Sequence, residues 1–345
     1  AFSFITYFVL GLALVVTPTF TATSVNGDRQ AGTLALLQAT RLSAVQMAAG
    51  KLLAAWLTGL VFLIVATPFI AWSMALGNIS VWQVVVCFVV LFALVAVISA
   101  VGLGWSAILG RPAGSTVMTY LTVLVLTVIA PIAMALLTTV TIEKTTYRVW
   151  GLPSSVRAEY QAQVDAFYRS ANPDTATFPA PPLDKCAWTE QPGQEQARPD
   201  RWAWLLLPNP FIVVADAAPL PPSAQGNVGA YASSNSDGLA LVRYGVRALM
   251  QRPSIERDEC VDLYLTNPGY SVERDSVGNV VKVTTQDGTV VNVNSPVKRS
   301  AISTENPLWP WGLGFNVLLG AVFFGLAVKR LSVPYGVLPK GTRVA

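Results

Sequence analysis

The chain has 345 residues, 53% of them hydrophobic and 12% charged, with a mean hydropathy of +0.50, which is too apolar for an ordinary soluble domain. The sequence contains no histidine, which excludes Ser-His-Asp and Cys-His catalysis and the commonest metal ligand. It also contains no Walker A pattern, so we do not expect the chain to hydrolyse ATP or to act as an enzyme by itself.

Five uncharged blocks are each long enough to cross a bilayer, which takes about 20 residues of helix. They contain no Asp, Glu, Lys or Arg and cover residues 5–25, 52–76, 81–109, 116–142 and 308–328. Because a backbone in lipid must satisfy its own hydrogen bonds, we expect all five to be helices. The first block is rich in Thr and Ser in its second half, but these hydroxyls can bond to the preceding turn, so a helix is expected there too.

The charges between the blocks predict the orientation of the chain in a cell membrane. Residues 26–51, 110–115 and 329–345 hold one acid, Asp28, against eight basic residues: Arg29, Arg41, Lys51, Arg111, Lys329, Arg330, Lys340 and Arg343. The positive-inside rule places these segments in the cytoplasm and residues 143–305 outside the cytoplasm. The net charge of +4 therefore indicates topology, and no nucleic-acid partner is expected.

An amphipathic segment, residues 26–51, separates the first two blocks. Leu34 and Leu37 recur at helical spacing, and Ser43 and Gln46 have the spacing of a capping box, which begins a helix. We therefore expect a short helix, a break, and a second helix that continues into the second block. Two uses remain open, namely a rigid knob on which a soluble partner pushes and an interfacial helix that rests on lipid headgroups.

Several short motifs carry a resemblance to a transporter family. They are Gly32-Thr33-Leu34, Leu36-Leu37, Leu42-Ser43, Gly50-Lys51, Leu207-Pro208-Asn209-Pro210-Phe211 and the ending at residues 330–345. In these motifs the chain resembles the permease subunits of ABC-2 type transporters, of the actinobacterial type. It departs from the family where Asp28 and Gln30 replace two Glu residues and where Arg41 replaces Pro.

The resemblance implies an ABC-2 permease fold, a polytopic α-helical membrane protein with five visible spans of an expected six. The remaining span would precede residue 1. It also implies that residues 26–51 are a coupling elbow that docks on a separate ATP-binding subunit. The residues carried over to that contact are Asp28, Arg29, Gly32, Thr33, Leu34, Leu37 and Arg41.

The partners implied by the resemblance are two copies of the ATP-binding subunit and a second permease chain, identical or homologous. The chain itself would bind no cofactor and no metal, because ATP and Mg would belong to the ATP-binding subunits. An extracytoplasmic partner is a further expectation for residues 143–305.

Residues 143–305 are expected to form an extracytoplasmic α+β domain inserted before the last span. Helical spacing recurs in residues 156–167 and 239–250, and β-branched runs at 280–285 and 289–294 flank Asp287-Gly288, a strong hairpin signal. A third strand is expected at residues 270–274. The aromatic stretch 202–214 has two readings, a segment in the outer membrane interface or a buried element of the outer domain.

Cys186 and Cys260 both lie in the region expected outside, where conditions are oxidising, whereas Cys87 lies within a span. A disulfide between Cys186 and Cys260 is therefore expected, and two unpaired thiols are the alternative, because spacing does not show proximity.

These expectations divide the chain into residues 1–142 with the elbow, the domain at 143–305, and residues 306–345 with the last span and a cytoplasmic tail. The expected function is the membrane subunit of an ATP-driven exporter. Because no span holds a charge that could guide ions or protons, an amphipathic or lipid-like cargo is expected. The alternatives are a non-transporting ABC complex that acts on an envelope partner and, third, a membrane enzyme with few catalytic groups.

Overall fold

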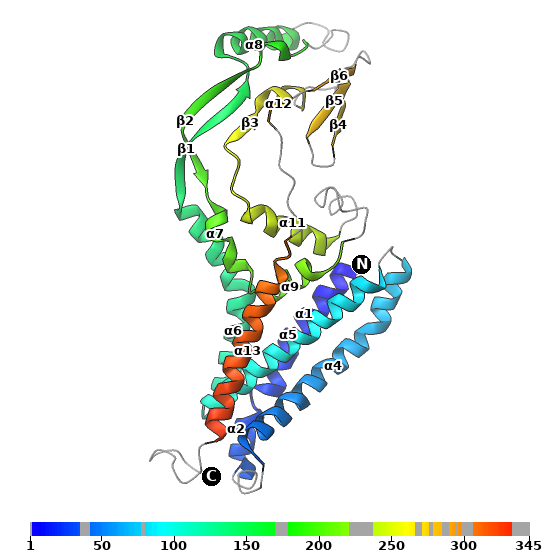
Figure 1. The fold of residues 1–345 in the computed structure, drawn as a ribbon, viewed down its shortest axis with the longest axis vertical. Helices are drawn as coiled ribbons and strands as arrows, with labels where there is room; N and C mark the ends of the chain where they lie inside the picture. The colour runs from blue at the N-terminus through cyan, green and yellow to red at the C-terminus, as the bar shows by residue number, and fades with distance from the viewer. Residues whose placement is uncertain are drawn as a thin grey trace. The chain divides into compact units, whose positions relative to one another are not determined.

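The structure is a computed structural model, and it describes residues 2–34, 42–76, 80–169, 179–220, 237–265, 271–275, 279–284, 290–293, 295–297 and 306–332 (Figure 1). The chain divides into two compact units. The first, here called the membrane unit, comprises residues 1–136, 203–248 and 304–345. The second, the insert unit, comprises residues 137–202 and 249–303. This division differs from the expected domain boundaries, because residues 203–248 belong with the membrane helices.

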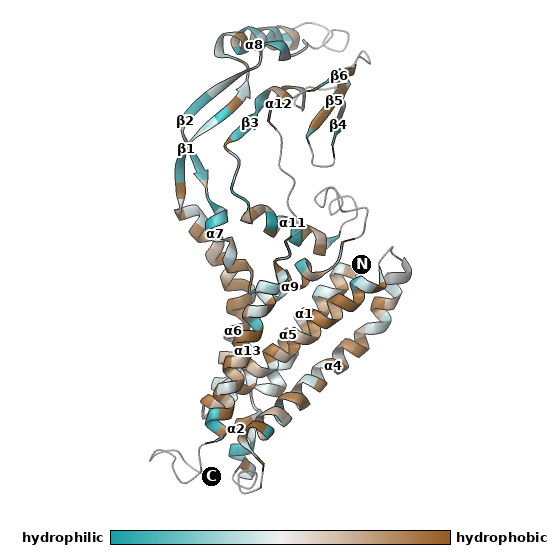
Figure 2. Cartoon of the chain, viewed as in Figure 1, coloured by the Kyte–Doolittle hydropathy of each residue, from teal (hydrophilic) through white to brown (hydrophobic). Residues whose placement is uncertain are grey.

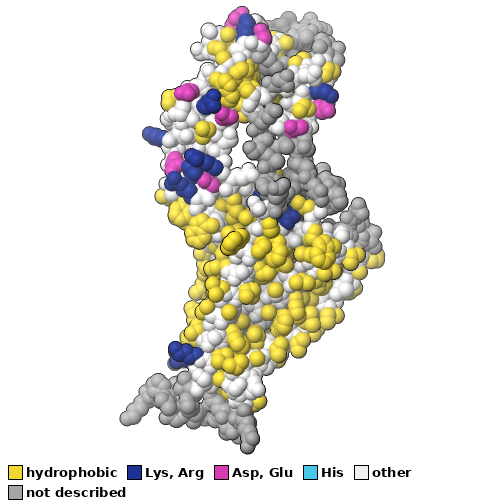
Figure 3. All heavy atoms as spheres, viewed as in Figure 1, with side chains coloured by type: hydrophobic (Ala, Val, Ile, Leu, Met, Phe, Trp, Pro, Cys, Tyr) yellow, Lys and Arg dark blue, Asp and Glu magenta, His cyan; other side chains and the backbone are white. Residues whose placement is uncertain are grey.

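Among the described residues, five helical segments of the membrane unit are long and apolar enough to cross a membrane. They are α1 (Phe2–Thr21) with α2 (Ser24–Gln30), α4 (Ala44–Leu76), α5 (Val81–Ile108), α6 (Pro112–Leu124) with the π-helix η1 (Val125–Ile129) and α7 (Ala130–Val140), and α13 (Trp309–Leu331). Figure 2 shows hydrophobic residues along all of them, and Figure 3 shows hydrophobic side chains over most of their visible surface. These features fit the expected polytopic α-helical membrane protein.

Helix α5 is the centre of the membrane unit. Its side chains Leu91, Leu94 and Ile98 are at most 1% exposed and belong to a core that α1, α4 and α13 complete. Glycines allow the neighbouring helices to approach closely, because a side chain on Gly102 would collide with Thr21 of α1 and one on Gly104 with Phe323 of α13.

The first span is helical despite its hydroxyl residues, as expected. Thr19 donates to the carbonyl of Val16 at 2.6 Å, Thr21 to Thr17 at 3.1 Å and Ser24 to Thr21 at 2.9 Å. These three hydroxyls are thus satisfied by the helix itself, which breaks after Thr21 and resumes as α2.

The stretch 203–218 folds as the 3-10 helix η4 (Ala203–Leu206) and helix α9 (Pro210–Ala217) within the membrane unit. Val213, Val214 and Ala215 are at most 1% exposed and belong to the core around α1 and α5. The expected place in the core of the outer domain is wrong, because the buried part of this stretch packs in the core of the membrane unit. Helix α11 (Gly238–Met250) follows at the expected position.

The insert unit contains a sheet of order β2-β1-β3. Strand β1 (Ile142–Gly151) pairs antiparallel with β2 (Ala187–Ala197) and parallel with β3 (Glu256–Asp258). The sequence did not indicate β1 or β2, because β2 carries Pro192 and Gly193 and reads as a polar loop. Helix α8 (Ser154–Arg169) has the expected place, and this part also contains η2 (Leu183–Lys185), η3 (Pro199–Arg201) and α12 (Glu259–Leu265).

The expected Cys186–Cys260 disulfide is confirmed. It joins the chain just before β2 to helix α12, beside a small core that contains Leu152 and Tyr160. The expected three-stranded meander is also confirmed. It comprises β4 (Ser271–Arg274), β5 (Val280–Thr284) and β6 (Val290–Asn292), all antiparallel and in that order.

Candidate functional site

Helix α2 ends in a tight turn at the start of the elbow. The N–H of Ala31 donates to the carbonyl of Gly27 at 2.9 Å, and the N–H of Gly32 donates to Arg29 at 3.3 Å. Gly32 has a φ of 71°, a backbone conformation that other residues rarely adopt, so it ends α2. Thr33 begins the next helical turn and donates from its hydroxyl to the carbonyl of Asp28 at 3.2 Å.

An ion pair joins the two arms of the elbow. Asp28 of α2 contacts Lys51 of α4, and Lys51 also donates to the carbonyl of Ser24 at 2.8 Å. The two charged side chains are 28% and 20% exposed, respectively. Pairs that remain in contact with water contribute about 0–1 kcal/mol, so this contact sets the relative direction of α2 and α4 more than it stabilises the fold.

The junction between α1 and α2 is held by buried hydroxyls from two other spans. Ser106 of α5 accepts hydrogen bonds from the backbone N–H groups of Val25 at 3.0 Å and Asn26 at 3.2 Å. Ser115 of α6 accepts from Asn26 Nδ2 at 3.0 Å and donates to the carbonyl of Ala22 at 2.6 Å. Sequence reasoning missed these contacts, because a serine in an apolar run gives no signal of its distant partner.

The expected capping box at the start of α4 is present. The N–H of Ser43 donates to Gln46 Oε1 at 2.9 Å, and the N–H of Gln46 donates to Ser43 Oγ at 3.2 Å. Helix α4 then runs to Leu76 without a break. The expected continuation of the second elbow helix into a span is therefore confirmed.

The apolar residues expected to contact the ATP-binding subunit are Leu34 and Leu37, and the structure describes only Leu34. Leu34 is 8% exposed and packs with Val25 and Ala48 in the core of its own chain. Leu37 and Arg41 lie outside the described residues. Two apolar side chains that the sequence reasoning did not select, Leu42 and Val45, are 48% and 53% exposed beside the capping box.

The other end of the membrane unit contains a span with an internal proline and, near it, a buried asparagine. Pro131 has no N–H, so the carbonyl of Thr127, four residues earlier, loses its helical partner. Asn209 supplies the missing donor, with its Nδ2 3.1 Å from that carbonyl oxygen, while its Oδ1 caps α9 by accepting from Phe211 at 3.0 Å. The π-helix Val125–Ile129 covers the same stretch.

Helix α13 contacts residues Leu207–Phe211, here called the connector, from another side. Asn316 is fully buried and donates from Nδ2 to the carbonyls of Pro208 and Gly312, both at 2.8 Å. A side chain on Gly312 would collide with the carbonyl of Leu207, so α13 lies directly against the connector. The Leu207–Phe211 motif therefore links three helical segments of the membrane unit.

A buried ion cluster lies next to this connector. Asp216 Oδ1 accepts from Arg247 Nε at 2.8 Å and lies 3.4 Å from Arg243 Nε, and Arg243 also donates to the carbonyl of Asp216. Asp216 Oδ2 accepts the first N–H groups of α13, from Leu308 at 2.7 Å and Trp309 at 2.9 Å. An acid at a helix N-terminus is also favoured by the helix dipole.

Opposing effects set the protonation of this cluster. Burial raises the pKa of Asp216, but the Arg247 hydrogen bond and the charges of Arg243 and Arg247 outweigh it and hold that pKa below its usual range. Burial lowers the pKa of Arg243, although Asp216 partly compensates. Over the described residues, no group of three or more His, Cys, Asp or Glu side chains could hold a metal ion.

Comparisons with protein-family models, with curated proteins and with solved structures find no significant match to this chain.

Proposed function

We propose that this chain is the membrane subunit of an ATP-driven exporter of ABC-2 type, which couples ATP hydrolysis by a separate subunit to the efflux of an amphipathic or lipid-like substrate. The observation that carries the proposal is the construction of the elbow. The Asp28–Lys51 pair joins α2 to α4, and α4 continues from the capping box into a span. Movement imposed on this end would be transmitted along α4 instead of being absorbed by a loose loop.

The geometry refines which residues would dock on the ATP-binding subunit. Leu34 holds the elbow to its own chain, so the exposed Leu42 and Val45 are the apolar anchors, with Arg29 at the rim. Burial of an exposed Leu or Val side chain contributes about 1.5–3 kcal/mol, which is enough for two such residues to dominate a small interface. Charged rim contacts contribute less, because water screens them.

The test is co-purification of the full chain from its native membranes with an ATPase that carries a Walker A sequence. The double variant Leu42→Asp with Val45→Asp should lose most of that ATPase, because acidic side chains cannot be buried unpaired in an apolar contact. The control Val290→Asp changes a residue of the insert unit that is 57% exposed and should retain the ATPase. If the double variant retains as much ATPase per chain as the wild type, Leu42 and Val45 do not form the contact.

If no ATPase co-purifies with the wild-type chain, the exporter proposal is wrong. Where an ATPase is present, its rate distinguishes export from a non-transporting complex. An exporter should hydrolyse ATP faster when an amphipathic cargo is added, whereas a complex that drives an envelope partner should not respond to cargo.

The proposed orientation has its own test with a membrane-impermeant thiol reagent on whole cells. A cysteine at the exposed position Ala162 of α8 should react on intact cells, and one at the exposed position Ala31 should react only after lysis. The reverse pattern would invert the topology.

A further inference from the structure

Helix α11 turns an uncharged face outward. Its outward positions within the membrane unit follow the spacing of one helical face and comprise Leu241, Tyr244, Gly245 and Ala248, here called the α11 stripe. Leu241 is 51% exposed, and Tyr244 is 37% exposed. No residue of the stripe is charged, so most of the exposed side-chain surface on this face is apolar.

The charges of α11 point in the opposite direction. Arg243 and Arg247 have side chains that are only 11% and 5% exposed, and both contact Asp216. A helix in water turns its charges toward solvent, because a buried charge is costly even when it is paired. The reversed arrangement on α11, with the ions inside and the apolar residues outside, indicates that the surroundings of the stripe are apolar.

The position of α11 is set by the ends of two spans. Asp237 caps the helix by accepting from the N–H groups of Leu239 at 3.1 Å and Ala240 at 3.3 Å, and it accepts from Ser3 at the start of α1 at 2.6 Å. Asp216 joins the arginines to the start of α13. Because α13 begins at this level, α11 lies at a boundary of the membrane and not within its centre.

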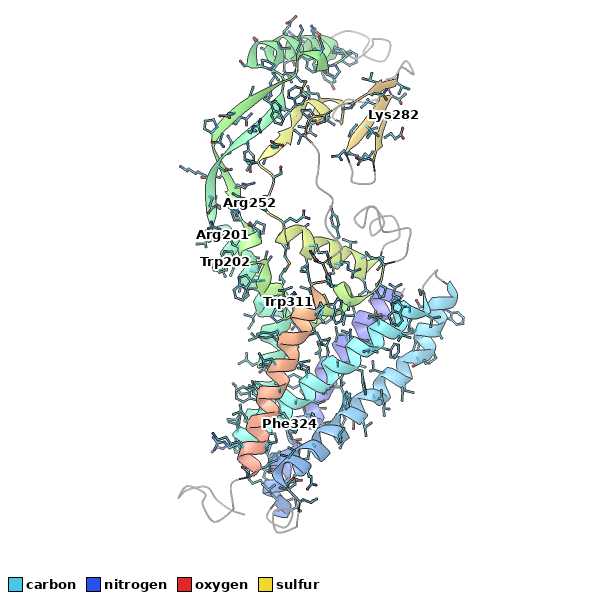
Figure 4. All side chains as sticks on the ribbon, in the orientation of Figure 1. Arg201, Trp202, Arg252, Lys282, Trp311 and Phe324 are labelled. Carbon is cyan, nitrogen blue, oxygen red and sulfur yellow. A yellow bond between two sulfur atoms is a disulfide. The ribbon has the colours of Figure 1, made fainter. Side chains whose placement is uncertain are left out.

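Exposed aromatic side chains occur at the same end of the membrane unit. Trp311, labelled in Figure 4, is 75% exposed in the first turn of α13, and Trp204 of η4 is 56% exposed. Tryptophan and tyrosine favour the region between lipid headgroups and acyl chains. The membrane unit therefore exposes aromatic residues of the kind that favour this region at the same end as the α11 stripe.

We propose that α11 lies in the headgroup–acyl boundary of the bilayer, with the α11 stripe against lipid and its arginines neutralised inside the protein by Asp216. This segment was expected in an extracytoplasmic domain, and its assignment to a lipid surface does not depend on the exporter proposal. It would hold equally for a membrane protein that transports nothing. The lipid contact would set the height of the connector at Leu207–Phe211 in the membrane.

The experiment places spin labels on the full chain in phosphatidylcholine vesicles. Cysteine is introduced singly at Leu241 and at Tyr244, at Leu318 of α13 as a lipid-facing control, and at Ala162 of α8 as a water-facing control. Cys87 is buried and Cys186 is bonded to Cys260, so the introduced thiol is the accessible one. Because Leu241 and Tyr244 are exposed, neither substitution removes a core contact, and either position alone tests the proposal.

For each spin label, two accessibilities are measured, one to oxygen, which enters lipid, and one to a nickel chelate, which stays in water. The result is the ratio of the first to the second. Labels at Leu241 and Tyr244 should give a ratio several-fold above that at Ala162 and below that at Leu318, as expected at a shallow depth. A ratio equal to that at Ala162 would show that the stripe faces water. Low accessibility to both reagents would show that protein, such as a second copy of the chain, covers it. Either result would overturn the proposal.

Discussion

Arg247 donates a 2.8 Å hydrogen bond from Nε to Oδ1 of Asp216, and the two side chains are 5% and 3% exposed. Thirty-one residues of sequence separate them. With Arg243 and the first N–H groups of α13, the pair joins α9, α11 and α13, which lie far apart along the chain. The contact is therefore a tertiary anchor at one end of the membrane unit.

Removal of the charge at Asp216 should be strongly destabilising. Asp216→Asn keeps the size of the side chain but leaves Arg247 buried without its carboxylate, and a broken buried pair costs about 3–5 kcal/mol. Thermal unfolding of the purified chain in detergent measures the loss. The matched control Asp165→Asn, on an exposed position of α8, should change stability by less than about 0.5 kcal/mol. Equal effects of the two variants would contradict a structural role for the cluster.

The same carboxylate predicts how stability depends on pH. The pKa of Asp216 lies below its usual range, so its contribution is fully present above the unfolded value of about 3.9 and is lost as pH falls through the lower folded value. Stability should change little on this account between about pH 7 and pH 5 and should fall below about pH 4. Unfolding in detergent at several pH values measures this, and Asp216→Asn should show a smaller acid-induced loss than wild type.

Asp200 of the insert unit should contribute in the same direction, because its hydrogen bond to Arg198 lowers its pKa. The combined variant Asp216→Asn with Asp200→Asn should therefore have the weakest acid dependence of the set. An acid dependence as steep as that of wild type in this combined variant would assign the effect to other carboxylates.

The hydrogen bond from Asn209 to the carbonyl of Thr127 should matter only while Pro131 is present. Asn209→Ala leaves that partly buried carbonyl without its donor and should cost about 1–3 kcal/mol. Pro131→Ala restores the N–H that the carbonyl lacks, so Asn209→Ala should cost less in that background. A double-mutant cycle of unfolding free energies measures the coupling, and strictly additive effects would show that the two residues act independently.

Loss of the disulfide should weaken the insert unit. The bond closes a loop between residues 74 apart, and a disulfide of this kind typically contributes about 2–4 kcal/mol. Cys186→Ser with Cys260→Ser should lower the unfolding temperature reported by protease resistance of the insert unit. Wild type treated with reductant should behave in the same way, whereas the double variant should not respond to reductant. A response in the double variant would indicate that another thiol is involved.

Local patterns in the sequence determined much of this protein. Uncharged runs of spanning length predicted the five long helices, and Ser43 with Gln46 predicted the start of α4. The Asp287-Gly288 signal between β-branched runs predicted the β5–β6 hairpin. Each of these depends on residues close together in the chain, whose preferred backbone conformation and periodicity act over a few turns or one hairpin. The Cys186–Cys260 pairing was also expected, because the charge pattern left two cysteines in one compartment.

Only the tertiary structure decided which distant residues each side chain and each strand would contact. The spacing of Leu34 marked it as part of an apolar face but did not show whether its own chain or another would cover it, and it is covered by its own chain. Strand β2 reads as a loop until β1 supplies the hydrogen bonds that its backbone requires. The sequence predicted the helix at residues 239–250, but only the tertiary structure shows that its Arg243 and Arg247 pair with Asp216 in the interior. A sequence pattern indicates which groups need a partner. It does not identify that partner, because burial, ion pairing and hydrogen bonding act between residues that are far apart along the chain and close in space.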